Sequence, residues 1–313
     1  MRASCVITNF NYAPFLPDAL NSVFNQVEPF AEIIVVDDFS TDESIAVLEQ
    51  YGQLHTNLQI VRHERNLGQL AAFASGFNAA NGDVICFLDA DDIYAPTYLK
   101  VMLEVYKSAP DCDFLFCKNQ VIARPADFSP HVGTWYGKLE CMGRTVVQTL
   151  AYTHFIGEPT SCLSLKRSIA DKIFPIPYFE DWKTRADDCL VFGASLAGAK
   201  KYKVAVPLVG YRQHPYNAYL SNSISSDADT FFRREVALIR LFLFFRNRFG
   251  LSADTFQLAH LEFKTCPSVT IRSFLMYLAI VVKVGARNSG RGRAVGVMLK
   301  HYLHCYRLSR GRT

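Results

Sequence analysis

The chain has 313 residues, of which 50% are hydrophobic and 20% are charged. This composition excludes a disordered or low-complexity protein and supplies enough apolar material for one large domain or two. The nine cysteines include no C-x-x-C pair. Most of them lie in apolar sequence, so we expect buried, reduced thiols and neither a disulfide framework nor a zinc site. A short apolar segment follows Met1-Arg2 directly, and no signal peptide is expected.

Apolar segments typical of buried strands alternate with helical patterns through the first part of the chain. Strands are predicted at residues 4–10, 32–38, 58–63, 82–90 and 112–122. Helices are predicted at residues 15–26, 44–51, 68–80 and 97–109. Ser40 and Glu43 have the S-x-x-E spacing of a capping box before the second helix. The alternation predicts an α/β fold with a mainly parallel sheet and helices on both faces.

Two groups of carboxylates follow predicted strands. Asp37 and Asp38 end the second strand, and Asp89, Asp91 and Asp92 end the fourth. In a parallel sheet both groups open onto one crevice beyond the carboxyl ends of the strands. Like charges this close raise one another's pKa. A hard cation such as Mg²⁺ or Mn²⁺, bound together with a phosphate-bearing substrate, would compensate them.

A structural role explains one group more readily than the other. An aspartate at a strand end often begins a turn or caps a helix, and Asp37-Asp38 taken alone favours that interpretation. A cap needs one carboxylate, so the cluster at residues 89–92 favours a site. The sequence has no G-x-G-x-x-G fingerprint and no phosphate-binding P-loop, which argues against a dehydrogenase or a kinase.

Taken in order, the motifs of the chain resemble those of family 2 glycosyltransferases of the GT-A fold. The matching segments are VITNFNY, VVDDFSTDES, RNLG, GDVICFLDADD, PTSCLSLKRSIADKIFPIP, ADDCL and YRQHPYN. They extend over roughly the first 220 residues. Each motif is weak alone, and their joint order carries the resemblance. It implies a nucleotide-sugar donor, with a UDP-sugar as the first expectation, a divalent metal, and inversion at the anomeric carbon.

The resemblance also implies roles for individual residues in binding the donor. Asp89 and Asp91 match the D-x-D pair that engages the ribose and the metal-bound diphosphate. Asp92 is the adjacent carboxylate expected to share the metal, and His214 matches a histidine that closes over the metal and the diphosphate. The other expected donor-binding residues are Thr8, Asn9, Phe10, Asp38, Arg65, Asn66, Gly68, Ala90 and Arg212.

Asp187 and Asp188 are the candidate bases that take the proton from an acceptor hydroxyl. Asp187 falls at the general-base position of the family and keeps the D-x-x-L spacing to Leu190. Helical spacing also places Asp187 on an apolar stripe, where a carboxylate calls for an explanation. From the sequence alone, a helix N-cap explains it nearly as well. Asp188 remains the alternative base.

Three positions depart from the pattern of the family. Phe10 stands where tyrosine is frequent, Phe73-Ala74 replaces an Arg-Asn pair, and Ala186-Asp187 replaces Glu-Asp. A basic contact to the donor is therefore expected from another residue, Arg65 or Arg212. The departures mildly favour a second hypothesis, a catalytically silent module that binds a nucleotide or a sugar. A third is a nucleotidyltransferase, which would release pyrophosphate.

The C-terminal part of the chain is basic. Ten of the 33 Lys and Arg residues follow Glu262, and no acidic residue does. We therefore expect a GT-A catalytic domain at residues 1–222 and a helical, basic extension at residues 223–313. Its apolar segments are shorter than the roughly 20 residues needed to cross a bilayer. Basic residues interleaved with Leu, Val and Tyr predict helices that lie on an anionic membrane surface. An extension packed on the catalytic domain with solvated charges is an equal alternative.

These expectations describe a metal-dependent, inverting glycosyltransferase of polysaccharide biosynthesis. Its acceptor would be a saccharide or a lipid-linked saccharide, and its location the cytoplasm or the inner face of the membrane. No nucleic-acid partner is expected, because no segment resembles a recognition module. The sequence leaves the sugar, the linkage and the oligomeric state open.

Overall fold

The computed structural model describes residues 1–130, 139–215, 217, 228–267, 269–283 and 291–310. Its strands are β1 (Ala3–Asn9), β2 (Glu32–Asp37), β3 (Leu58–Arg62), β4 (Val84–Asp89), β5 (Ile93–Tyr94), β6 (Phe114–Ile122), β7 (Leu139–Gly143), β8 (Leu163–Lys166) and β9 (Lys201–Arg212). Within the described residues they form one nine-stranded sheet in the order β3-β2-β1-β4-β8-β6-β9-β5, with β7 paired to β9. The five predicted strands are confirmed as β1, β2, β3, β4 and β6.

The four predicted helices are also confirmed, and each begins within one residue of its expected start. The helices are α1 (Leu16–Phe24), α2 (Ser44–Leu54), α3 (Gln69–Ala79), α4 (Tyr98–Ser108), α5 (Val146–Tyr152), α6 (Arg167–Ile173), α7 (Asp187–Leu196), α9 (Ala228–Phe249), α10 (Ala259–Lys264), α11 (Ile271–Lys283) and α12 (Arg291–Arg310).

The strands that carry the acidic groups are parallel neighbours. β1 pairs in parallel with both β2 and β4, so that Asn9 lies beside Asp37 and Thr8 lies beside Asp89. β3 adds a further parallel strand next to β2. The other half of the sheet is mixed, because β8 runs antiparallel between β4 and β6 whereas β9 is parallel to β6. The carboxyl ends of β1, β2 and β4 therefore meet at one edge, as predicted.

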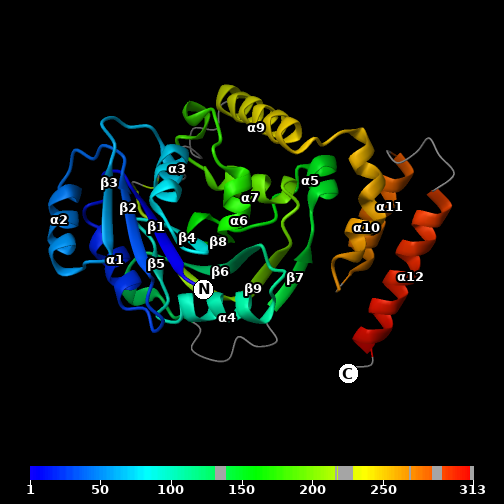
Figure 1. Cartoon of the computed structure of the whole chain (residues 1–313), viewed down its shortest axis with the longest axis horizontal. Coiled ribbons are helices and arrows are strands. Elements are labelled where there is room, and N and C mark those ends of the chain that lie inside the picture. The colour runs from blue at the N-terminus through cyan, green and yellow to red at the C-terminus, as the bar shows by residue number, and fades with distance from the viewer. Residues whose placement is uncertain (131–138, 216, 218–227, 268, 284–290, 311–313) are drawn as a thin grey trace.

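Each face of the sheet is covered by its own helices (Figure 1). Cys5 and Ile7 of β1 pack into the core that includes residues of α1, α2 and α4, whereas Val6 packs into the core of α3, α6 and α7. This alternation is that of a strand buried on both sides. Helix α3 lies especially close to the sheet, since a Cβ atom at Gly76 would overlap Val6 Cγ1.

The C-terminal helices belong to two different cores. Leu241 and Phe245 of α9 are fully buried in the same core as α7 and the sheet. Helices α10, α11 and α12 share a separate apolar cluster that includes Phe263, Tyr277 and Met298. Figure 1 shows these three helices together at the end of the molecule opposite α2. Helix α9, which the sequence analysis assigned to the extension, therefore packs with the sheet, whereas α10, α11 and α12 pack with one another. Across the described residues, no helix combines the length and the apolarity needed to cross a membrane.

The predicted capping box before α2 is wrong. Glu43 occupies the N-cap position, and its side chain makes no capping hydrogen bond. Ser40 Oγ instead accepts hydrogen bonds from Asn9 Nδ2 at 3.1 Å and from the Asn11 N–H at 2.9 Å. The serine that the pattern assigned to a helix cap therefore holds the loop after β2 against the end of β1.

Candidate active site

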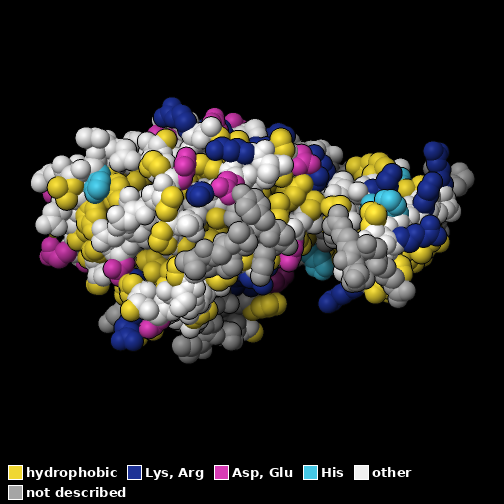
Figure 2. All heavy atoms as spheres, turned by 90° about the horizontal axis from the view of Figure 1, so that it is seen from below, with side chains coloured by type: hydrophobic (Ala, Val, Ile, Leu, Met, Phe, Trp, Pro, Cys, Tyr) yellow, Lys and Arg dark blue, Asp and Glu magenta, His cyan; other side chains and the backbone are white. Residues whose placement is uncertain are grey.

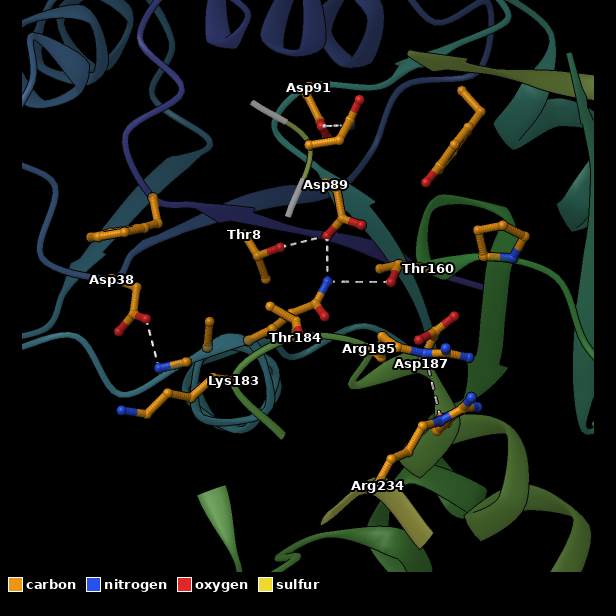
Figure 3. Close-up of a pocket in the computed structure, with 18 of the residues that line it drawn as sticks. Thr8, Asp38, Asp89, Asp91, Thr160, Lys183, Thr184, Arg185, Asp187 and Arg234 are labelled. Atoms are coloured by element: carbon orange, nitrogen blue, oxygen red, sulfur yellow. Dashed lines mark hydrogen bonds and ion pairs between the residues drawn. The ribbon is translucent and has the colours of Figure 1, made fainter. Parts of the chain in front are cut away.

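A cavity of about 890 Å³ opens at the carboxyl ends of β1, β2 and β4. Ten of the residues expected from the sequence lie on its wall: Thr8, Asn9, Phe10, Asp38, Asn66, Gly68, Asp89, Asp91, Asp187 and Asp188. Helix α9 completes the wall with Arg234, Glu235 and Leu238. In the view of Figure 3, Asp89 lies between Asp38 and Asp187. The fold thus gathers carboxylates from β4, the end of β2 and α7 into one space.

Asp37 has a structural role. Its Oδ2 accepts a hydrogen bond from Asn9 Nδ2 at 2.7 Å, and its Oδ1 accepts the Ser40 N–H at 2.9 Å. It is not part of the cavity wall. The turn interpretation of the sequence therefore applies to Asp37 and not to its neighbour Asp38.

Asp38 faces the cavity and is held by three donors. It accepts the backbone N–H groups of Leu67 and Gly68 at 2.8 and 2.7 Å, and His63 Nδ1 lies 2.7 Å from its Oδ1. Burial alone would raise the pKa of Asp38, but the hydrogen bond from His63, followed by those from Leu67 and Gly68, brings it below its ordinary value. Asp38 is thus an ionised acceptor in a fixed position.

Asp89 connects the strand-end cluster to α7. Its Oδ1 accepts hydrogen bonds from Thr8 Oγ1 at 2.8 Å and from Gln69 Nε2 at 2.9 Å. Gln69 Oε1 in turn accepts the Ala186 N–H at 3.0 Å, directly before α7. Burial, and then the charge of Asp91, raise the pKa of Asp89 to about 6, although these hydrogen bonds oppose the shift.

Asp91 and Asp92 are adjacent in sequence but differ in surroundings. Asp91 is on the cavity wall, and its Oδ2 lies 3.0 Å from both His214 Nε2 and Asn217 Nδ2. Asp92 lies behind the wall, where its Oδ2 accepts from Ser161 Oγ at 2.5 Å and its Oδ1 accepts the Arg212 N–H at 2.8 Å. Burial, and then the charges of the neighbouring aspartates, raise the pKa of Asp92 well above its usual value.

Asp187 and Asp188 form the first turn of α7. The N-cap residue is Ala186, so the interpretation of Asp187 as an N-cap is wrong. Asp188 Oδ2 lies 3.4 Å from an Arg234 guanidinium nitrogen and 3.8 Å from Arg185 Nε. Burial, followed by the charges of Asp188 and then Asp89, raises the pKa of Asp187 to about 7. Of the two, Asp187 has the pKa suited to a base near neutral pH.

Five expected site residues are not on the cavity wall: Arg65, Ala90, Asp92, Arg212 and His214. Arg65 is exposed to solvent. The guanidinium of Arg212 donates to Asp18 Oδ2 at 2.9 Å and lies 5.0 Å from the centre of the Phe15 ring. Of these five, His214 contacts a wall residue through its hydrogen bond with Asp91.

The structure adds cationic and amide side chains that the sequence did not single out: Gln69, Asn119, Lys183, Arg185 and Arg234. Gln69 follows the RNLG motif directly, and this position in the sequence could have indicated that it belongs to the site. Lys183 is brought to the wall by a close approach to Gly68, which has a φ of 89° and whose Cβ would lie 2.5 Å from Lys183 Cα. Arg185 has a φ of 61°, which is rare for a residue with a side chain.

The acidic cluster offers oxygen ligands but no complete metal site. In the parts of the chain that the structure describes, no group of three or more His, Cys, Asp or Glu side chains is arranged to hold a metal ion. Asp91 and Asp89 both reach the cavity. Their carboxylates suit a hard cation that takes its remaining ligands from water or phosphate.

Comparison with known proteins identifies the family. The model of glycosyl transferase family 2 matches residues 4–174. An uncharacterized glycosyltransferase of Nostoc sp. is 32% identical over 227 residues, which cover 71% of this chain and 67% of the relative. The chain therefore belongs to glycosyl transferase family 2. It covers less than half the length of the next curated relatives.

Solved structures share the fold at low sequence identity. TarS of S. aureus, residues 1–349 in complex with UDP-GlcNAc, aligns with a TM-score of 0.55 at 16% identity, over 97% of this chain and 73% of that one. GalNAc-T7 with UDP, GalNAc and Mn²⁺ aligns with a TM-score of 0.52 at 17% identity, over 68% of this chain and 44% of that one. The predicted GT-A fold is confirmed.

Proposed function

We propose that the protein is a metal-dependent, inverting glycosyltransferase that uses a nucleotide-diphospho sugar, with UDP as the nucleotide. The observation that carries this proposal is the single cavity that joins Asp38, Asp89, Asp91 and Asp187. An ionised anchor, a strand-end acidic pair and a carboxylate of raised pKa are the parts that sugar transfer needs. The UDP complexes of TarS and GalNAc-T7 support the choice of nucleotide.

The nucleoside would lie beside Asp38, Thr8 and Asn9. Asp38 keeps its position through hydrogen bonds from Leu67 and Gly68, and a carboxylate oxygen can accept more than one donor. Asn9 lies on the same wall, and its Oδ1 is buried with no hydrogen-bond partner among the described residues. Acceptors in fixed positions suit the N–H and O–H donors of a base and a ribose.

A divalent cation, Mg²⁺ or Mn²⁺, would be held by Asp91 together with Asp89 and the donor diphosphate. The donor set fits, because magnesium sites often consist of one or two carboxylates completed by substrate phosphates. His214 and Asn217 keep Asp91 in place through its Oδ2. When bound, the cation would stabilise the charge of the leaving diphosphate as a Lewis acid.

Asp187 would act as the general base. The acceptor hydroxyl loses its proton to Asp187 while its oxygen attacks the anomeric carbon opposite the diphosphate, and the nucleoside diphosphate leaves. A base in this position contributes about 10²–10⁴-fold to the rate. Asp188 would hold Arg185 and Arg234 beside it and, through its own charge, keep the pKa of Asp187 high.

The acceptor would enter along the apolar side of the cavity. Val121, Phe155, Phe192, Tyr211 and Leu238 lie on this wall, and such side chains pack against the apolar faces of sugar rings. A saccharide or a lipid-linked saccharide fits this surface.

A lipid-linked acceptor would be consistent with contact between the C-terminal helices and a membrane. Ile271, Leu275 and Val282 form an exposed apolar stripe on α11, and Leu299, Leu303 and Tyr306 form another on α12. Arg272, Lys300 and Arg307 lie next to these stripes and are exposed. Figure 2 shows basic and hydrophobic side chains together on this end of the molecule, with no acidic side chain in view. We propose that this surface binds an anionic lipid bilayer at the inner face of the membrane.

Calorimetric titration of UDP into the purified protein, with and without Mn²⁺, tests the donor site. Metal-dependent binding is expected, followed by release of UDP from a UDP-sugar when an acceptor is present. Release of pyrophosphate would instead identify a nucleotidyltransferase. UDP binding without turnover of any UDP-sugar would favour a catalytically silent module, and absence of UDP binding would contradict the choice of nucleotide.

Sedimentation with vesicles tests the membrane surface separately. The full chain should bind vesicles that contain phosphatidylglycerol and not vesicles of phosphatidylcholine alone, and Lys300→Glu and Leu303→Glu should each weaken binding. Leu54→Glu is the matched control, since Leu54 is 75% exposed but lies on α2. Equal binding of all three variants would rule out the proposed surface without affecting the donor site.

A further inference from the structure

Two of the nine cysteines differ from the rest. None of the nine forms a disulfide, and seven are buried, as the sequence predicted. Cys141 and Cys266 are partly exposed. They are 125 positions apart: Cys141 lies on β7, and Cys266 lies between α10 and α11. The two partly exposed cysteines therefore occur where the sheet meets the C-terminal helical unit, which consists of α10, α11 and α12.

Each of these thiols contacts the backbone around the other. Cys266 Sγ lies 2.9 Å from the carbonyl oxygen of Cys141, and Cys141 Sγ lies 3.9 Å from the carbonyl oxygen of Thr265. The two segments also come close at Gly143, since a Cβ atom added there would lie 3.2 Å from Cys266 Cβ. The Arg144 N–H donates to Thr265 Oγ1 at 2.8 Å and fixes the same contact. The arrangement is a reciprocal pair rather than an isolated cysteine.

The surroundings of Cys141 favour its thiolate. A hydrogen bond from the Cys266 thiol is the largest influence and lowers the pKa of Cys141 to about 6, although burial opposes it. Hydrogen bonds from Gly143 and Tyr202 and the charge of Lys200 act in the same direction. Near Cys266, His301 Nε2 lies 3.1 Å from the Cys266 carbonyl oxygen, and Cys305 Sγ lies 3.6 Å from His301 Nε2. A thiolate, and not a thiol, is the nucleophile in disulfide exchange.

We propose that Cys141 and Cys266 form a redox-reactive pair that a low-molecular-weight disulfide such as oxidised glutathione converts into an intramolecular disulfide. The Cys141 thiolate attacks one sulfur of glutathione disulfide, forms a mixed disulfide and releases one glutathione thiolate. The Cys266 thiol then gives its proton to the released glutathione thiolate and attacks Cys141 Sγ, which forms the Cys141–Cys266 bond. The second glutathione leaves as a thiolate and takes a proton from water. Glutathione disulfide is reduced to two thiols, and the two cysteines are oxidised to one disulfide.

The bond would join β7 covalently to the connection between α10 and α11. That helical unit already supports the cavity side of the protein through Glu262, whose carboxylate accepts the N–H groups of Val147 and Gln148 at 2.7 and 3.1 Å at the start of α5. Helix α5 leads to Thr153 and Phe155 on the cavity wall. Oxidation would therefore fix the attachment of the helical unit. This inference does not depend on the proposed function.

Peptide mapping of the full chain tests the pair. The native protein is incubated in glutathione buffers of increasing oxidised fraction, quenched by alkylation, digested without reduction, and analysed by mass spectrometry. We expect one disulfide-linked peptide pair, containing Cys141 and Cys266, and no modification of the seven buried cysteines. In Cys266→Ser, Cys141 should accumulate the mixed disulfide with glutathione. Cys305→Ser is the matched control and should still form the Cys141–Cys266 bond.

The wild-type chain gives a second test that needs no substitution. The rate of alkylation of Cys141 by iodoacetamide should be half-maximal near pH 6, about two to three pH units below that of an ordinary cysteine. A link between Cys266 and Cys305, or a link that forms only after denaturation, would overturn the proposal. Slow alkylation of Cys141 throughout the neutral range, with no linked peptide, would overturn it as well.

Discussion

The acidic cluster after β4 and the acidic pair at the start of α7 each contain two consecutive aspartates, but their surroundings differ. In each, two aspartates follow one another in sequence, and one of the two is engaged by neighbouring side chains or backbone. Asp91 reaches the cavity while Asp92 binds Ser161 and the Arg212 backbone. Asp187 and Asp188 both line the cavity, and Asp188 forms ion pairs with Arg185 and Arg234.

The comparison teaches that the surroundings divide the roles among identical neighbours. After β4, burial and the charge of Asp91 raise the pKa of Asp89. A bound cation would compensate these two carboxylates. At α7, Arg185 and Arg234 compensate Asp188, and Asp187 is left with a pKa of about 7. Under the proposed function, the first cluster would hold the metal-bound diphosphate and the second would take the proton of the acceptor.

Asp187→Asn should have the largest effect among the variants that test the roles of these aspartates. Since the amide cannot take a proton, kcat should fall by about 10²–10⁴-fold, while the affinity for UDP stays within about twofold of wild type. Steady-state kinetics and UDP titration measure the two quantities. Asp188→Asn is the matched control and should retain more activity. A larger loss of kcat in Asp188→Asn than in Asp187→Asn would exchange the two roles.

Asp91→Asn should remove the metal dependence of the donor site. The amide oxygen is a weaker ligand than a carboxylate, so the gain in UDP affinity on adding Mn²⁺ should fall by about 10–100-fold. Calorimetry in the presence and absence of metal measures it. A variant that keeps the full metal-dependent gain would show that the cation binds elsewhere.

The pH dependence separates the two regions further. A base must be deprotonated to act, and the raised pKa of Asp187 means that this carboxyl is half protonated near pH 7. The value of kcat/KM should therefore fall about tenfold per pH unit below pH 7 and level off above it. Because the charge of Asp188 helps to raise the pKa of Asp187, Asp188→Asn should move the profile to lower pH. An unmoved profile would mean that another group is titrated.

Asp92→Ala should affect folding more than binding. The substitution leaves Ser161 Oγ and the Arg212 N–H without their buried acceptor, and such losses cost about 1–3 kcal/mol each. Chemical denaturation should show this loss of stability, with UDP affinity little changed at a temperature where the variant is folded. A selective loss of metal-dependent binding would instead assign Asp92 to the metal site, as the sequence suggested.

Lys183→Ala should give the smallest effect. Lys183 lies on the cavity wall, but its side chain is 49% exposed and pairs with Glu180. Loss of such an exposed charge should weaken UDP binding by about two- to fivefold. Arg65→Ala is the control and should leave the affinity unchanged, because Arg65 is exposed and off the wall. Weaker UDP binding in Arg65→Ala than in Lys183→Ala would instead identify Arg65 as the basic contact to the donor.

Much of the site was accessible to sequence reasoning because its residues follow strands. Thr8, Asp38, Asp89 and Asp91 each lie at the end of a strand or just beyond one, and parallel pairing brings these ends together. The site residues that the sequence analysis missed do not lie at the ends of parallel strands. Arg234 reaches the cavity from α9, which the sequence assigned to the extension, and Lys183 reaches it through a close backbone approach to Gly68.

The sequence by itself determined the alternation of strands and helices, the family and the two acidic clusters, since hydrophobic periodicity and short motifs are local properties of the chain. Only the tertiary structure decided that Asp91 faces the cavity whereas Asp92 does not. It also decided that Asp188 forms ion pairs with two arginines and that Cys141 lies near Cys266. These outcomes depend on contacts between segments more than 40 residues apart, such as Asp188 with Arg234 and Asp92 with Arg212. Burial and neighbouring charge at such contacts set a pKa, and neither can be read from the order of residues.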